Sequence, residues 1–112
     1  MKGGKKRPAK RAALLEAIKA ALDEGRVRDV THAMERQEER AITRPEYFHV
    51  LRSGYHEARK DEWKEEYQAW NYAIRGKTVD ERGIRVAVSF EQVKGKSGET
   101  LLIITVIGVD DA

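Results

Sequence analysis

The 112-residue chain contains no cysteine and only two prolines. The absence of cysteine excludes disulfides and thiolate metal sites, and it suits a reducing compartment such as the cytoplasm. No apolar run reaches the length that crosses a membrane. The basic N-terminus is not followed by the apolar stretch of a secretory signal. These absences predict a cytoplasmic protein that makes no membrane contact.

Charge is distributed unevenly along the chain, although the net charge is only +3. Residues 1–11 hold six lysines and arginines and no acid, whereas the remainder has more acidic than basic residues. We interpret 1–8 as a basic disordered tail and 9–112 as a single domain. Such a tail either binds nucleic acid through its phosphates or only keeps the chain soluble.

Hydrophobic spacing and capping residues predict three helices before residue 55. Apolar residues in the first helix recur at three and four positions, and Gly25 follows as a natural stop. Thr31 is placed to cap the second, and Thr43 with Glu46 forms the capping box of the third. The predicted helices cover 9–24, 32–40 and 44–53.

The last third of the chain changes to a period of two. Trp70, Tyr72 and Ile74 alternate with small or polar residues, as do the apolar residues of GIRVAVSF, and TLLIITVIGV is apolar throughout. These patterns predict three or four antiparallel strands. Residues 26–30 are expected to be short and extended, and residues 55–66 are either a strand (YHEARK) followed by a charged loop (DEWKEE) or a helix. The fold class is therefore α+β, with N-terminal helices on one face of a C-terminal three- to four-stranded antiparallel sheet.

A stripe of cationic side chains lies on the predicted second helix. His32, Arg36 and Arg40 are four residues apart, so a helix places them on one face. Two guanidiniums one turn apart can bind phosphate oxygens, and a histidine can transfer protons near neutral pH. The alternative is a solvated helix face whose arginines pair with neighbouring glutamates.

A second basic set lies on the predicted sheet. Arg75 and Arg85 belong to neighbouring strands and should point away from the core, with Lys77 two residues beyond Arg75. Asn71 and Ser89 share this face. The set forms either a cationic binding face or the ordinary solvated side of an antiparallel sheet.

Metal binding has little support in the sequence. His32, His49 and His56 are far apart and show no ligand spacing with one another or with acidic residues. We expect neither a metal site nor a cofactor.

Several motifs together resemble a bacterial and archaeal domain family of unknown function. They are RDVTHAMERQEERAIT followed by VLRSG, and then WNYAIRGK, GIRVAVSF and IITVI, which are similar to its three closing strands. The resemblance covers about residues 27–107. The order is also similar to the motility quorum-sensing regulator toxin, a RelE-like ribonuclease. This similarity implies a RelE-like fold.

RelE-like toxins cleave mRNA without a metal and are held by an antitoxin, so the resemblance implies RNA and a protein antitoxin as partners. Their active residues are Lys, Arg, Tyr or His on the sheet and a nearby helix. The matching residue types in this chain are His32, Arg36, Tyr72, Arg75, Lys77 and Arg85. One departure is Ala41, which replaces the glycine that the family pattern has after Glu39-Arg40.

Two functions from different classes follow. In the first, the chain is a metal-independent endoribonuclease, with His32, Arg36, Arg75 and Arg85 in catalysis. Its substrate-binding residues would be Arg40, Asn71, Tyr72, Lys77 and Ser89. In the second, it is a non-catalytic module that binds protein or nucleic acid, which the acidic body outside the tail favours. Convergence of the His32 stripe with Arg75 and Arg85 would favour catalysis.

Overall fold

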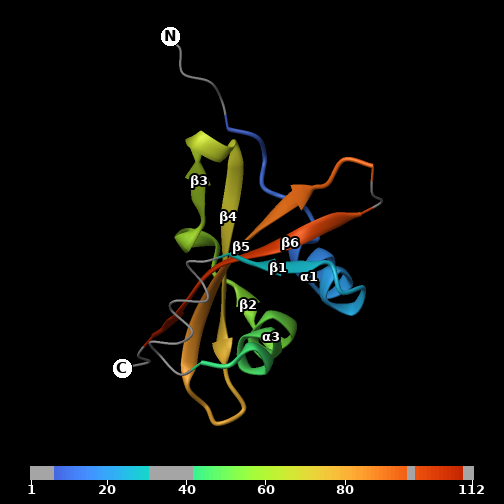
Figure 1. Cartoon of the computed structure of the whole chain (residues 1–112). Coiled ribbons are helices and arrows are strands. Elements are labelled where there is room, and N and C mark those ends of the chain that lie inside the picture. Colours follow the sequence, from blue (N-terminus) through green and yellow to red (C-terminus); the bar gives the residue numbers. More distant parts are fainter. Residues whose placement is uncertain (1–6, 31–41, 96–97, 110–112) are drawn as a thin grey trace.

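The computed structural model describes residues 7–30, 42–95 and 98–109. Two α-helices occur among these residues, and they pack against a strongly twisted sheet (Figure 1). The helices are α1 (Leu14–Asp23) and α3 (Arg44–Ser53), and two short 3-10 helices cover Ala58–Lys60 and Glu65–Tyr67. The strands are β1 (Val27–Asp29), β2 (Tyr55–His56), β3 (Glu62–Lys64), β4 (Ala69–Lys77), β5 (Gly83–Gln92) and β6 (Glu99–Gly108).

The described strands form one six-stranded mixed sheet in the order β1-β6-β5-β4-β2, and β3 also pairs with β4. β4, β5 and β6 are antiparallel neighbours, in agreement with the period-two patterns. β1 is parallel to β6, from which it is separated by most of the chain. β2 and β3 both pair with β4, at different positions along that strand.

The α+β class is correct, but the predicted RelE-like arrangement is wrong. The described sheet has six strands rather than three or four, one of its pairings is parallel, and β1 lies between α1 and α3 in the chain. β1 and β2 fall within residues 26–30 and 55–60, which the sequence indicated as extended or as a strand, whereas β3 was expected to be a charged loop; each has only two or three residues. Elements this short are identified by their pairing partners and not by hydrophobic periodicity.

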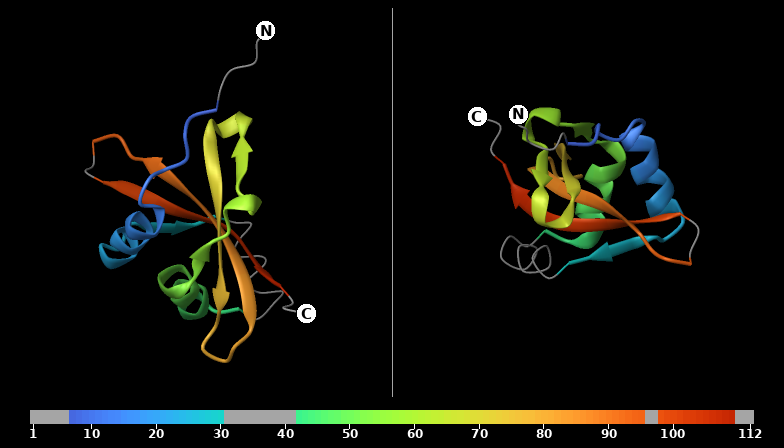
Figure 2. Two further views of the ribbon diagram at one scale, coloured as in Figure 1. Left: turned by 180° about the vertical axis from the view of Figure 1, so that it is seen from behind. Right: turned by 90° about the horizontal axis from the view of Figure 1, so that it is seen from above.

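Both helices cover the same face of the sheet (Figure 2). They contribute buried side chains at helical spacing, and the sheet contributes alternate residues of its three long strands. The main members of this core are Leu14, Ile18, Leu22, Tyr47, Val50, Leu51, Tyr72, Ile74, Ile84, Val86, Val88, Leu101, Ile103 and Val106. Odd-numbered residues of β4, including Arg75, therefore point to the opposite face.

α1 begins at Leu14 and not at residue 9, because contacts with the sheet hold the preceding segment. The Trp70 Nε1–H donates to the Pro8 carbonyl at 2.9 Å, and Lys10 forms an ion pair with Asp61 at 3.0 Å. Arg11 forms an ion pair with Glu99. We call residues 7–11 the N-terminal arm; in Figure 1 it runs from the tip of the β3–β4 hairpin toward α1.

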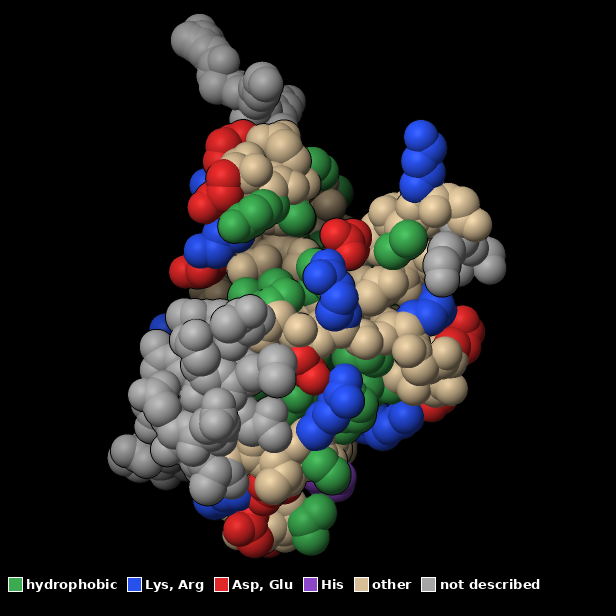
Figure 3. All heavy atoms as spheres, in the orientation of Figure 1, with side chains coloured by type: hydrophobic (Ala, Val, Ile, Leu, Met, Phe, Trp, Pro, Cys, Tyr) green, Lys and Arg blue, Asp and Glu red, His purple; other side chains and the backbone are tan. Residues whose placement is uncertain are grey.

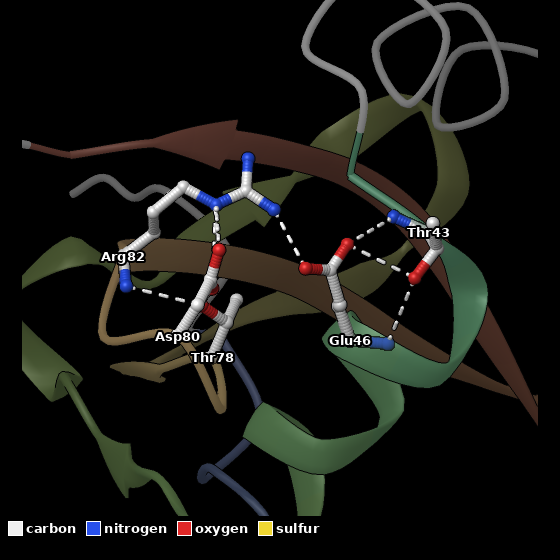
Figure 4. Close-up of polar contacts among 5 residues, drawn as sticks. All are labelled: Thr43, Glu46, Thr78, Asp80 and Arg82. Atoms are coloured by element: carbon white, nitrogen blue, oxygen red, sulfur yellow. Dashed lines mark hydrogen bonds and ion pairs between the residues drawn. The ribbon is translucent and has the colours of Figure 1, made fainter.

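α3 has the predicted bounds and the predicted capping box. The Thr43 Oγ1 accepts from the Glu46 backbone N–H, and the Glu46 Oε1 accepts from the Thr43 N–H at 2.7 Å. Figure 4 shows that the second carboxylate oxygen of Glu46 meets Arg82, with the Nη2–Oε2 distance at 2.6 Å. Arg82 also contacts Asp80, whose other partner is Thr78. This network joins the start of α3 to the β4–β5 turn.

Candidate functional site

Arg75 and Arg85 lie directly opposite each other on β4 and β5. This pairing confirms the prediction that the two arginines share one face of the sheet. Tyr55 of β2 is the partner of Arg75 on its other side, so the three residues form a row across three strands. The row lies on the face opposite α1 and α3, because its neighbours Ile74 and Val86 are in the core.

Glu57 joins the two arginines. Its Oε1 accepts from the Arg85 Nε–H at 2.8 Å, and its Oε2 accepts from Arg75 Nη1 at 3.3 Å and from Arg85 Nη2 at 3.4 Å. The Glu57 side chain is only 4% exposed, and each of these two guanidinium side chains is 19% exposed. Arg59 lies at the border, with its Nη2 3.6 Å from Oε2. We call these four residues the arginine cluster.

The carboxylate of the arginine cluster is ionised. Hydrogen bonding from Arg85 lowers the pKa of Glu57 below its ordinary value, and this effect outweighs the burial that would raise it. Glu57 is therefore ionised at neutral pH and orients the guanidiniums. Among the described residues, Glu57 is thus the shared carboxylate of three guanidiniums.

Arg85 keeps a donor for a ligand. Its Nε and Nη2 donate to Glu57, while its Nη1 has no partner among the described residues. A guanidinium fixed by a carboxylate on one edge can donate from the other to a planar or tetrahedral oxyanion. The geometry therefore suits a phosphate group placed against the exposed side of the cluster.

Two glycines bring Tyr55 to the arginines. A Cβ on Gly54 would lie 2.5 Å from the Arg75 carbonyl oxygen, and one on Gly76 would lie 3.1 Å from the Gly54 Cα. Only glycine allows β4 and the end of α3 to approach this closely. The result is an open hollow of about 270 Å³ lined by Tyr55, Arg75, Gly76 and Lys77.

The other sheet residues that were predicted for the site differ in exposure and in distance from the arginine cluster. Lys77 lines the hollow and is exposed, as a binding residue should be. Tyr72 is 5% exposed, and its hydroxyl accepts from the Arg11 N–H, so it belongs to the core. Ser89 is also 5% exposed and donates to the Trp70 carbonyl. Asn71 lies on the face of the cluster but about 13 Å along the strand from Arg75.

The predicted stripe of His32, Arg36 and Arg40 lies outside the described residues. Its convergence with Arg75 and Arg85, which the sequence suggested as the sign of catalysis, therefore stays a prediction.

Sequence reasoning missed three residues of the site: Tyr55, Glu57 and Arg59. All three belong to the segment YHEAR, whose two-residue strand β2 and 3-10 helix leave no periodic pattern. No local signal in the sequence identifies Glu57 as the partner of the two arginines. Recognising it requires knowing that this segment pairs with β4. The Glu57 N–H donates to the Ala73 carbonyl, which fixes that position.

A separate polar group lies on the helix side of β2. His56 Nε2 is 2.7 Å from Asp61 Oδ2, and the Asp61 side chain is fully buried, with its Oδ1 accepting from the Ala73 N–H. His56 also lines an open hollow of about 500 Å³ beside the start of α1. Because Tyr55 and His56 alternate along β2, this histidine is not part of the arginine cluster.

Outside the cluster, many surface charges are paired. Figure 3 shows Lys and Arg side chains beside Asp and Glu over the described part of one face. Examples among the described ion pairs are Arg28 with Glu91 and Arg44 with Asp29. No group of three or more metal-binding side chains occurs within residues 7–30, 42–95 and 98–109. In the same residues, no helix is long and apolar enough to cross a membrane.

Comparison of the chain with protein-family models, with curated proteins and with solved structures gave no match.

Proposed function

We propose that this protein binds single-stranded RNA at the arginine cluster and cleaves its phosphodiester bonds without a metal ion. The observation that carries the proposal is the pair of cross-strand arginines held by one buried carboxylate. Arginines arranged in this way present fixed donors to a phosphate. Tyr55, which is 56% exposed and lies beside Arg75, would stack on a neighbouring unpaired base.

In the proposed reaction, the ribose 2′-oxygen attacks the adjacent phosphorus and the bond to the 5′-oxygen breaks. The 2′-hydroxyl proton passes to a general base, and the leaving oxygen receives a proton from a general acid. Negative charge grows on the phosphorane oxygens during this step. Arg85 Nη1 and the Arg75 guanidinium would stabilise that charge, since they are held in place before the substrate binds.

His32 keeps the proton-transfer role that the sequence suggests, and Arg36 and Arg40 keep their predicted roles in catalysis and RNA binding. Lys77 would contact a second phosphate from the rim of the hollow. A protein antitoxin as partner follows from the same family resemblance and stays part of this proposal.

Binding without cleavage is the second candidate function. It is favoured by one observation: His56, the histidine nearest in sequence to the arginine cluster, lies on the other face of the sheet. The cluster alone would then hold a phosphate without transferring a proton.

The test is cleavage of end-labelled single-stranded RNA in EDTA, with binding measured in parallel by filter retention. The variants are His32→Ala and Arg85→Gln. Arg52→Gln is the matched control, because Arg52 is an exposed arginine paired with Asp23 between the two helices. Thermal unfolding of each variant shows that it is folded.

Cleavage by the wild type and Arg52→Gln that is lost in both other variants supports the ribonuclease. RNA binding that depends on Arg85 without cleavage supports the second candidate. If the wild type neither binds nor cleaves RNA, both functions are wrong.

A further inference from the structure

The free end of the β3–β4 hairpin carries the only two tryptophans of the chain. Trp63 and Trp70 are cross-strand partners, with ring centroids 5.7 Å apart in an edge-to-face arrangement. Both rings are partly exposed, and the hairpin end projects from the body of the sheet in Figure 1. We call this pair the tryptophan ledge.

Polar contacts of the tryptophan ledge are made at the ring edges. The Trp63 Nε1–H donates to Glu65 at 3.1 Å, and the Trp70 Nε1–H donates to the Pro8 carbonyl at 2.9 Å. These bonds fix the orientation of both indoles without using their faces. A flat ligand can therefore stack on an exposed part of a ring without breaking a hydrogen bond.

Cations of the N-terminal arm lie against the ledge. The Lys10 Nζ is 5.0 Å and the Arg7 Cζ 5.9 Å from the Trp70 ring centroid, both within the range of a cation–π contact. The sequence before Arg7 adds Lys2, Lys5 and Lys6 and no acid. Aromatic faces are thus combined with positive charge that continues along the chain.

We propose that the tryptophan ledge and the N-terminal arm form a second contact for single-stranded nucleic acid, separate from the arginine cluster. An unpaired base stacks on an indole face, and a flanking phosphate meets Arg7, while Lys10 stays paired with Asp61. Single-stranded nucleic acid is the ligand with this combination of flat bases and regularly spaced negative charge. Because Trp70 and Arg75 lie on opposite faces of β4, the ledge is a contact distinct from the arginine cluster.

The inference rests on the proposed function for the identity of the ligand as RNA, and the experiment separates the two. Decauridylate is titrated into the protein while tryptophan fluorescence is recorded, with Trp63→Phe and Trp70→Phe isolating each ring. Stacking of a base on the ledge is expected to quench the fluorescence in a saturable way. Deca-deoxyuridylate should quench similarly, because stacking does not use the 2′-hydroxyl.

Affinity is measured with labelled decauridylate for Trp63→Leu, which keeps an apolar side chain but removes the aromatic face. We expect binding about tenfold weaker than in the wild type, as for the loss of one stacked base. Arg52→Gln serves as the matched control and should bind as the wild type does.

Quenching that persists in Arg85→Gln, with weaker binding in Trp63→Leu, supports the ledge even if the protein cleaves no RNA. Absence of quenching, or wild-type affinity in Trp63→Leu, overturns the inference, and it does so even if RNA cleavage at the arginine cluster is observed.

Discussion

Substitution of Glu57 by glutamine tests how the arginine cluster is held together. Glutamine has nearly the same shape, but it lacks the charge that lies between Arg75 and Arg85. In the variant, two guanidiniums would remain opposite each other on neighbouring strands without their shared counter-ion. The unfolded chain loses no comparable interaction, so the change destabilises the folded state.

The size of the effect follows from burial. Loss of one partner from a buried ion pair typically costs about 3–5 kcal/mol. Arg75 and Arg85 are each 19% exposed, so water still reaches them. The glutamine oxygen also still accepts one hydrogen bond. We therefore expect the lower end, about 3 kcal/mol, which in a domain of this size lowers the melting temperature by roughly 10 °C.

Urea unfolding at several pH values measures this free energy. Arg85 and Arg75 lower the pKa of Glu57 in the folded state. The ionised carboxylate therefore stabilises the folded protein at pH values above the ordinary glutamate pKa of 4.5. That stabilisation is lost as the pH falls through the lower folded-state pKa. The difference between the wild type and Glu57→Gln should thus be full at neutral pH and shrink in acid.

Glu91→Gln is the control for this experiment, since Glu91 pairs with Arg28 on the same sheet but is 45% exposed. Its loss should cost less than about 1 kcal/mol. The reasoning is refuted if Glu57→Gln is no more destabilising than Glu91→Gln at neutral pH, or if its effect is the same in acid.

Three further substitutions test the frame around the site by urea unfolding. Gly54→Ala places a Cβ 2.5 Å from the Arg75 carbonyl and should cost about 2 kcal/mol or more, and a cost near zero would contradict the close approach. Thr43→Ala removes the side-chain acceptor of the capping box and should cost about 1 kcal/mol, whereas Thr43→Ser should be nearly neutral. Tyr47→Phe removes the hydroxyl that donates to Asp29 at 2.7 Å and should cost about 1 kcal/mol. Burial and Asp29 raise the pKa of Tyr47 well above its usual value. Ultraviolet titration should therefore find this phenol un-ionised at pH values at which exposed tyrosines are already ionised.

The parts of the fold that were predictable depend on neighbouring residues. The capping box at Thr43 and the stop at Gly54 correctly bound α3, because both signals act within one helical turn. The alternation in β4 and β5 also correctly placed Arg75 and Arg85 on one face. A period of two determines the face of every residue once the segment is a strand.

The parts that were not predictable depend on distant residues. α1 was expected from residue 9, but the arm up to Arg11 is held by Trp70, Asp61 and Glu99, which are 51 or more positions away. These contacts replace the first helical turns that the local composition favours. Similarly, residues 26–30 were expected to be extended, but the parallel pairing of β1 with β6 was not predicted.

For the candidate site, the sequence by itself determined the two arginines, their shared face and the exposed Lys77, since strand periodicity is a local property. Only the tertiary structure decided that Glu57 is buried between those arginines and that Tyr55 completes their row. The reason is that β2 has two residues and no pattern of its own. Its position follows from the close approach of Gly54 to β4, which no local feature of the chain reveals.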